Sequence, residues 1–414
     1  MNSRVHHTGL TWLAAPVLVA LAYFCAAKLG VALAFPAAPV SALWAPNAIV
    51  MAALLLAPRR HWWVYLVAVL CAHLAVQLPN FPFSRVVIQY LANAALAVFG
   101  ALAIRALNPA PLAFDRARSA FTLILFGGLL VPAATSLAMA GAFMAFGISG
   151  EFWLTVVART ITNAFAVVTL VPLIVHAVTR WDQRRATLKM ARLVEATTLA
   201  VALAGVCVVV FAVPLGSPHS TPPLVYAPLP LLAWASMRFG IPGACSASLL
   251  VGAISTLGML DGFGPFAGLD PVENALSVVT FHVVMCVSFV TFAALLEEWR
   301  HAGNALHVSE QRFRSILENN IIPTAIWHDD LRITEANDAF LQLTGCSGTD
   351  IEGGKLKFGE LAAWSGTPAL SGAGGEAFFG DIENVESELA LRDGRRVPVI
   401  LGHASFPSGE GGVI

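Results

Sequence analysis

The sequence predicts a polytopic α-helical membrane bundle followed by a small cytoplasmic α+β domain. Three observations predict this fold class. Of the 414 residues, 57% are apolar and only 12% are charged, a balance outside the range of water-soluble domains. Apolar runs long enough to cross a bilayer recur as far as residue 296. Acidic residues then become frequent, with 18 Asp and Glu in 297–414 against 7 in 1–296.

Ten segments of the first region carry enough apolar residues to be transmembrane helices, which need about 20 residues each. Clusters of Pro, Gly, Arg or Asp separate them. The second and eighth are the shortest, so eight spans is the alternative. The segments are 12–35, 41–57, 62–79, 86–106, 120–146, 154–178, 193–214, 223–237, 241–260 and 275–296.

The positive charges between these segments predict the orientation, because Lys and Arg stay on the cytoplasmic side of a membrane. With a cytoplasmic N-terminus, ten spans place twelve Lys and Arg on the inner side, Arg4 included, and only Arg85 in the outer loops. Removing one span would invert every later loop. We therefore expect ten spans with both termini in the cytoplasm. The outer loops are short, so the cue must reach a pocket between helices or dissolve in the bilayer.

Composition also argues against several kinds of site. The positive charges of the first region are spread singly, so they form no basic stripe for nucleic acid. Five of the six cysteines lie inside apolar runs, and no Cys-x-x-Cys or Cys/His cluster occurs. Neither a disulfide framework nor a metal site is predicted.

Polar side chains at membrane depth are candidates for a ligand site, because their burial in lipid is costly. Asn47 follows Trp44 and Pro46, and either faces a cavity beside a broken helix or marks a helix start. Arg159 and Asn163 are four residues apart and share one helix face. They bind an anionic or polar ligand, or they bond another helix. Interhelical hydrogen bonds are expected of His73, Gln89, Asn93 and His282.

Four groups of motifs occur in order through this region: Leu43-Trp44-Ala45-Pro46-Asn47-Ala48-Ile49 with Pro58-Arg59-Arg60, Asn163-Ala164-Phe165 with Pro172, Leu232-Ala233-Trp234 with Arg238-Phe239-Gly240, and Gly264-Pro265-Phe266. Their order resembles the MASE1 family, the membrane-associated sensor domain of bacterial signalling proteins. The resemblance covers about residues 12–297. Asn163 stands where the family usually has Asp. The resemblance implies a sensor, here of residues 1–296, in a bacterial inner membrane. The candidate ligand-binding residues are Trp44, Asn47, Arg159, Asn163, Trp234 and Arg238.

Residues 297–320 are expected to form a helical linker. Trp299, Leu306 and Phe313 recur every seven residues, although the intervening positions do not complete an apolar seam. This pattern predicts a short, imperfect coiled coil and a homodimer. Ser309 can cap a fresh helix start, so we expect a break or a register change in the helix there.

Residues 321–414 show the pattern of a small α+β sheet domain. The expected elements are a hairpin of 324–327 with 332–336, a helix of 338–344 that stops at Gly345, and a hairpin of 386–391 with 396–405 around Asp393-Gly394. Residues 411–414 read as the opening of a last, central strand. A domain that ended there would leave ladder groups unpaired, so we expect the chain to be the front of a longer polypeptide.

This region resembles a PAS domain across residues 309–414. The carriers are the runs 310–319, 333–340 with Leu343-Thr344-Gly345, and 391–395. Asn337 lies where a strand passes into a helix and is expected to bond backbone groups there. The residues expected to have structural or signalling roles in it are Asn337, Phe340, Gly345, Asp393 and Gly394.

No cofactor and no catalytic residue are expected. Cys346 lies in Thr344-Gly345-Cys346-Ser347, without the Asn-Cys-Arg-Phe-Leu run of flavin-photosensing PAS domains, and no His for haem lies between Asp338 and Glu388. Gly374-Gly375-Glu376-Ala377-Phe378 resembles the hairpin signature of diguanylate cyclases. Only 36 residues follow it, too few for the rest of that domain.

The sequence therefore predicts a membrane sensor that detects a small or membrane-borne cue and relays it through a PAS domain. The resemblance implies an output domain beyond residue 414. It would be a histidine kinase of a two-component system, acting on a response regulator, or a diguanylate cyclase that makes cyclic di-GMP. The alternatives are a transporter or membrane enzyme with a regulatory PAS appendage, and a silent scaffold that recruits partners through PAS.

Overall fold

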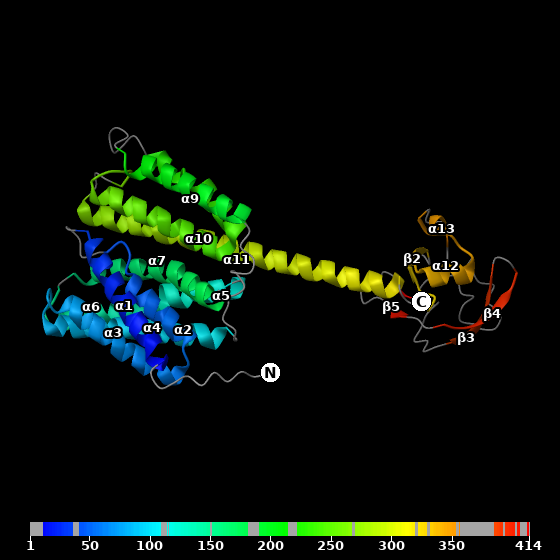
Figure 1. The fold of residues 1–414 in the computed structure, drawn as a ribbon, viewed down its shortest axis with the longest axis horizontal. Helices are drawn as coiled ribbons and strands as arrows, with labels where there is room; N and C mark the ends of the chain where they lie inside the picture. Colours follow the sequence, from blue (N-terminus) through cyan, green and yellow to red (C-terminus); the bar gives the residue numbers. More distant parts are fainter. Residues whose placement is uncertain are drawn as a thin grey trace. The chain divides into compact units, whose positions relative to one another are not determined.

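Figure 1 shows the computed structural model of the chain. The chain divides into two units, Met1–His301 and Ala302–Ile414, each described here by itself. The described residues are 11–35, 41–108, 114, 116–149, 151–180, 190–213, 222–266, 270–318, 322–328, 332–352, 356, 385–391, 394–401, 404–405 and 412–413.

The described part of the first unit is almost entirely helical. Its α-helices are α1 (Thr11–Ala32), α2 (Ala45–Leu56), α3 (Trp62–Gln77), α4 (Phe83–Leu107), α5 (Ala117–Thr122), α6 (Val131–Ala145), α7 (Phe152–Thr179), α9 (Met190–Phe211), α10 (Leu229–Leu260) and α11 (Pro271–Glu318). A π-helix, Leu123–Leu130, joins α5 to α6, and 3-10 turns lie at Arg59–His61 and Pro222–Tyr226.

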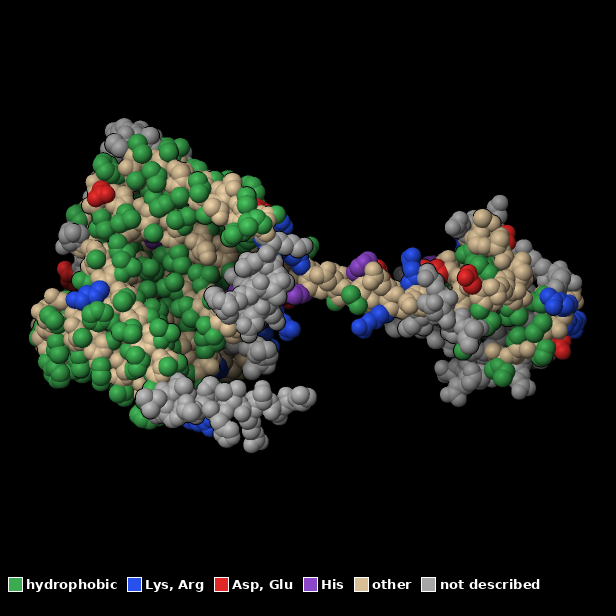
Figure 2. All heavy atoms as spheres, viewed as in Figure 1, with side chains coloured by type: hydrophobic (Ala, Val, Ile, Leu, Met, Phe, Trp, Pro, Cys, Tyr) green, Lys and Arg blue, Asp and Glu red, His purple; other side chains and the backbone are tan. Residues whose placement is uncertain are grey.

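Seven helices within the described residues are long and apolar enough to cross a membrane. The difference from the ten predicted segments has a structural basis. The second and third segments form α2 and α3, helices of 12 and 16 residues. The eighth and ninth fall within a single stretch, Leu224–Leu260. The prediction of a polytopic helical membrane bundle is confirmed, and apolar side chains are spread across its visible face in Figure 2.

Helix α10 changes direction at Gly240. This residue has a φ of 65° and a ψ of −153°, a conformation nearly restricted to glycine. A Cβ atom built at Gly243 would overlap the carbonyl oxygen of Ala235. Eight residues of straight helix span about 12 Å, so the two parts of α10 must fold back on each other. The eighth and ninth predicted segments are the two arms of this hairpin.

The short helix α2 is the centre of the bundle. It packs against α1, α3, α4 and α7. Nine of its twelve residues are buried: Pro46, Asn47, Ala48, Val50, Met51, Ala52, Ala53, Leu54 and Leu55. A helix that is apolar on all sides is expected inside a larger assembly. Its neighbours therefore shield α2 from lipid, and its length need not match the bilayer.

The alternating directions of the helices give the bundle two ends. At the first, which we call the basic end, α2 finishes and α3 begins. Arg105 donates there to the carbonyl oxygens of Leu55 and Ala57, at 2.6 and 2.7 Å. The opposite end carries the turn between α1 and α2, where the hydroxyl of Ser41 donates to the carbonyl of Gly30 at 2.8 Å.

Within its described residues, the second unit holds two small sheets and two short helices after α11. Its elements after α11 are β1 (Ala325–Trp327), β2 (Ile333–Ala336), α12 (Asp338–Thr344), α13 (Gly348–Glu352), β3 (Val385–Ala390), β4 (Arg396–Leu401), β5 (Ala404–Ser405) and β6 (Gly412–Val413). One sheet has the order β2-β1-β6-β5, and β3 pairs with β4. The first predicted hairpin and the helix lie where expected. The second hairpin forms too, but its strand predicted at 396–405 ends at Leu401, and Ala404–Ser405 pairs with β6 in the other sheet. Strand β6 is central, hydrogen-bonded to β1 and β5.

Of the two alternatives predicted at Ser309, the break is wrong. Helix α11 continues through it to Glu318. The segment after Gly303 holds no Pro or Gly and is rich in Ala, Leu, Glu, Gln and Arg, which favour helix. The capping potential of one serine is too weak to interrupt such a sequence.

Candidate functional site

A cavity of about 590 Å³ opens among the helix termini at the end of the bundle opposite the basic end. The C-terminal halves of α1 and α3, the start of α2 and α4, the end of α6 and the start of α7 form its walls. Its volume is in the range of pockets for small molecules. The lining includes three of the predicted ligand residues, Trp44, Arg159 and Asn163.

A hydrogen-bonded network joins three helices at the floor of this cavity. Asn47 of α2 donates its amide to the side-chain oxygens of Asn163 on α7 and Asn93 on α4, at 2.7 and 3.1 Å. Arg159 donates Nη2 to the same oxygen of Asn93, at 2.6 Å. The amide of Asn163 donates to the carbonyl of Arg159 at 2.7 Å. The structure thus brings Asn47, Arg159 and Asn163 together. For Arg159 and Asn163 this agrees with the prediction that they share one face of a helix.

The cavity wall concentrates unpaired polar atoms. Nine buried side-chain nitrogen or oxygen atoms of the described residues have no hydrogen-bond partner. Five of them belong to residues that line the cavity: Trp44 Nε1, Gln77 Oε1, Arg85 Nε, Gln89 Oε1 and Arg159 Nε. Buried polar groups in proteins are normally hydrogen-bonded, so such a concentration indicates a site that receives its partners from outside the chain.

Arg85 supplies a second positive charge to the cavity from the start of α4. Its guanidinium carbon lies 4.2 Å from the ring centre of Phe81 and 5.7 Å from that of Phe143. Contacts with aromatic faces stabilise a partly desolvated guanidinium. Glu151, which is exposed, is the one acidic residue of the lining.

His73 lines the cavity and also links two helices. Its Nδ1 lies 2.9 Å from the hydroxyl of Tyr23 on α1, and its Nε2 lies 3.2 Å from the carbonyl of Val86 on α4. The carbonyl can only accept, so Nε2 carries the proton and donates. His282 is likewise bonded to Ser255, at 2.6 Å. Both histidines make the interhelical bonds that the sequence predicts.

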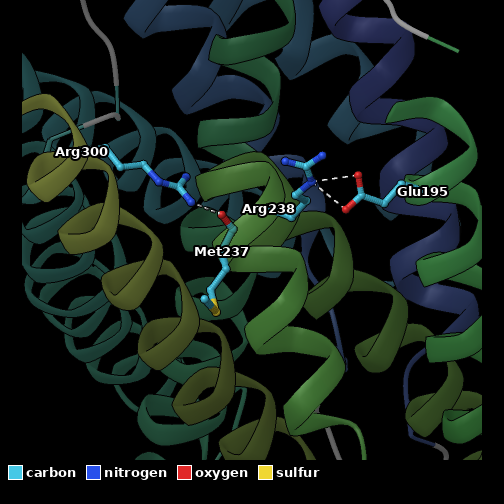
Figure 3. Close-up of polar contacts among 4 residues, drawn as sticks. All are labelled: Glu195, Met237, Arg238 and Arg300. Carbon is cyan, nitrogen blue, oxygen red and sulfur yellow. Dashed lines mark hydrogen bonds and ion pairs between the residues drawn. The ribbon is translucent and has the colours of Figure 1, made fainter. Parts of the chain in front are cut away.

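The other two predicted ligand residues, Trp234 and Arg238, do not line this cavity. Trp234 is 51% exposed. Arg238 lies at the basic end, where its Nε donates to both carboxylate oxygens of Glu195, at 2.6 and 2.8 Å (Figure 3). The structure therefore separates them from Asn47, Arg159 and Asn163.

A polar junction at the basic end holds the part of α11 that leaves the bundle. Arg300 donates to the carbonyl of Met237 at 2.6 Å, directly before the turn at Gly240 (Figure 3). Glu298 accepts a hydrogen bond at 3.1 Å from the backbone nitrogen of Ala117, the first residue of α5. Two different helices thus contact α11 near its exit.

In the second unit, Asn337 caps helix α12 and ties it to the preceding segment. Its Oδ1 accepts from the backbone nitrogens of Thr324 and Phe340, both at 2.9 Å, and its Nδ2 donates to the carbonyl of Ile322 at 2.8 Å. Phe340 is buried against β1 and β2 in a small apolar core.

Two glycines of this unit sit where the backbone requires them. Gly345 ends α12 with a φ of 69° and a ψ of 21°. Gly394 has a φ of 84° between β3 and β4. Both values are in the region that favours glycine. Asp393 lies outside the described residues.

Sequence reasoning missed Gln77 and Arg85 as cavity residues. Gln77 is the last residue of α3, and Arg85 falls in the outer loop between the predicted segments 62–79 and 86–106. A signal existed, because Arg85 and Gln89 are four residues apart and share one face of α4. No cluster of three or more His, Cys, Asp or Glu that could hold a metal ion occurs in the part of the chain that the structure describes.

Comparison with known families agrees with this architecture. The MASE1 family model matches residues 15–300, and a PAS domain model matches residues 311–378. No curated protein and no solved structure matches the chain. The membrane unit described above accounts for well over half of the sequence, and the chain belongs to the MASE1 family of membrane domains, here followed by a PAS domain.

Proposed function

We propose that the chain is a membrane sensor in which the cavity binds a small polar cue and α11 passes the resulting change to the PAS domain. The observation that carries this proposal is the continuity of α11. The helix runs from Pro271 to Glu318, and the boundary between the two units, His301 to Ala302, lies inside it. A continuous helix transmits rotation or displacement along its axis, so it can link a site in the bundle to the following domain.

A chain of contacts leads from the cavity floor to α11. Phe165 lies two residues after Asn163 on α7, and its ring centre is 5.0 Å from that of His282 on α11. The hydroxyl of Ser255 on α10 contacts the same histidine. A ligand that favours one packing of α7 against α2 and α4 would shift the population of α11 positions. The cue need not touch α11 itself.

Orientation is part of the proposal. Arg59, Arg60, Arg105 and Arg238 lie at the basic end, and the rule of positive residues inside places that end in the cytoplasm. The cavity would then open on the side of the bacterial inner membrane that faces away from the cytoplasm. A cytoplasm-only reporter fused at Arg185 should be active, and one fused at Pro218 should be silent. The reverse pattern would contradict this orientation.

The output chemistry is proposed to lie in a domain attached beyond the PAS unit, a histidine kinase in the first place and a diguanylate cyclase in the second. Homodimerisation through the exposed part of α11 would bring two such domains together. Trp299, Leu306 and Phe313 support this, because all three are exposed at a heptad spacing in the single chain.

The relay can be tested with the chain in lipid nanodiscs. A thermal-shift screen of small metabolites would identify a ligand, and hydrogen exchange of residues 322–328 and 332–352 would be measured with and without it. We expect the ligand to change exchange in these PAS segments. One alanine inserted after His301 rotates the rest of α11 by about 100° and should weaken that change. Seven inserted alanines, about two full turns, should restore it.

Two results would count against the relay. A ligand could bind and alter exchange only in the bundle, or both insertions could behave alike. Uptake of the same labelled compound into proteoliposomes, above the rate of protein-free vesicles, would instead favour a transporter with a regulatory PAS domain.

A further inference from the structure

The cavity has the charge of an anion site. Two of its lining residues, Arg85 and Arg159, are cationic, and the one acid of the lining, Glu151, is exposed. Neither guanidinium forms an ion pair with a carboxylate among the described residues. A cation that is uncompensated at membrane depth is costly, and an anionic partner reduces that cost.

The guanidinium of Arg159 is fixed by hydrogen bonds on one side, and its Nε remains able to bind a ligand. Its Nη2 bonds Asn93, which is itself bonded by Asn47, so two helices fix the position of the group. Its Nε is buried and unpaired. The planar fork of an arginine matches the two oxygens of a carboxylate, and such charged pairs are stronger than neutral hydrogen bonds. The unpaired Nε1 of Trp44 adds a neutral donor.

The remaining unpaired atoms of the cavity are hydrogen-bond acceptors, so they favour a ligand that also donates hydrogen bonds. Gln77 and Gln89 both present a buried side-chain oxygen without a partner, and both line the cavity. An amide oxygen only accepts hydrogen bonds. A simple anion without protons would leave these two oxygens unsatisfied, whereas a hydroxyl or ammonium group on the same molecule would pair with them.

We infer that the cavity binds a small organic acid whose carboxylate pairs with Arg159 and Arg85 and whose hydroxyl or amino group donates to Gln77 and Gln89. This inference rests on the proposed function and names the class of its cue. A volume of about 590 Å³ accepts such a molecule with room for water. The carboxylate has two possible sources, a soluble acid or the headgroup of a lipid such as phosphatidylserine.

The test measures binding to the full chain in phosphatidylcholine nanodiscs by calorimetry, independently of any signalling output. The probes are malate, glutamate and serine, their methyl esters, and glycerol 3-phosphate. We expect at least one free acid to bind and its ester to bind at least tenfold more weakly. Arg159→Gln should weaken binding at least tenfold, because the variant loses the charged donor that pairs with the carboxylate. Arg238→Gln is the matched control and should bind as the unmodified chain does.

A second variant covers the case in which Arg159→Gln does not fold. Trp44→Phe keeps an aromatic ring but removes the Nε1 donor together with part of the indole, so it should weaken acid binding at the cost of only a small loss of thermal stability from reduced packing. Arg159→Lys keeps the charge without the fork and should also bind more weakly.

The lipid source is distinguished by nanodisc composition. One outcome is that phosphatidylserine raises the thermal stability of the unmodified chain but not of Arg159→Gln, while phosphatidylglycerol stabilises neither protein. That outcome would support the carboxylate site and show that its carboxylate belongs to a lipid. Equal stabilisation by both lipids would overturn the assignment of a carboxylate. So would equal binding of acid and ester, binding of glycerol 3-phosphate alone, or no binding by any probe in either kind of nanodisc.

Failure of this inference and failure of the relay give different results. Binding of an acid without any change of exchange in residues 322–352 would leave the site intact and contradict the relay. A neutral ligand that changes exchange there, with no acid bound, would support the relay and overturn the carboxylate site.

Discussion

Two asparagine-centred clusters, one in each unit, use the same side chain in opposite ways. Asn337 of the PAS unit uses both its oxygen and its nitrogen, in three hydrogen bonds to backbone groups of the chain. Asn47 of the bundle bonds two other asparagines, and its own oxygen is buried without a partner. A fully paired side chain maintains a fold, whereas a cluster with unpaired atoms beside a cavity has capacity left for a ligand. The comparison predicts that substitutions in the two clusters differ in kind.

The largest loss of stability is expected from Asn337→Ala. The substitution removes one acceptor shared by two backbone N–H groups and one donor to a carbonyl. Leaving such groups unpaired should lower the local free energy of unfolding by about 3 kcal/mol. Hydrogen exchange of residues 322–328 and 332–344 in the full chain measures this local free energy of unfolding. Asn337→Asp retains the acceptor oxygen and should lose less stability than Asn337→Ala. Equal losses of stability in the two variants would show that the cap contributes little.

Gly240→Ala tests the hairpin turn of α10. An alanine at a φ of 65° and a ψ of −153° costs about 2 kcal/mol, since this region is nearly restricted to glycine. The thermal midpoint in detergent should fall, and the contact between Arg300 and Met237 should be disturbed. Gly205→Ala, in α9 with no atom within 4 Å of the new Cβ, is the control and should leave the midpoint unchanged or slightly higher. A similar fall in both variants would argue against a specific turn.

Asn163→Leu should separate function from stability. The variant loses the bond accepted from Asn47 and the bond donated to the carbonyl of Arg159. Asn47 keeps its bond to Asn93, and leucine fits a helix in a membrane, so the change in stability should stay within about 1 kcal/mol. Binding in the cavity and the response of the PAS segments should be lost. An equal loss of thermal stability would make the asparagine cluster structural, like that of Asn337.

The smallest effect is expected from Glu195→Gln at the basic end. This residue pairs with Arg238 in an ion pair that is largely accessible to solvent, with 56% of the arginine side chain exposed. Exposed ion pairs contribute little because water screens them. No resolvable change of the thermal midpoint is expected, and the ligand-binding curve should coincide with that of the unmodified chain. A clear shift in binding would connect this end of the bundle to the cavity.

Much of the fold follows from the sequence because local patterns suffice for it. The apolar runs give the helices, Asp338 to Thr344 lies between an N-capping Asn337 and the helix stop Gly345, and turn residues mark the two hairpins. The spacing of Arg159 and Asn163 places them on one face without any tertiary information. The failed prediction at Ser309 concerns a weak local signal that the surrounding helix formers override.

The sequence by itself determined that this chain is a polytopic membrane bundle followed by a PAS domain, since hydropathy, turn residues and motif order are local properties. Only the tertiary structure decided which polar residues meet. Asn47, Asn93 and Asn163 lie on three helices and up to 116 positions apart, and Arg85 joins Arg159 in one cavity while Trp234 and Arg238 stay outside it. Contacts between residues so far apart in the sequence depend on how the helices pack around α2. This packing is a long-range property that no single segment of the sequence contains.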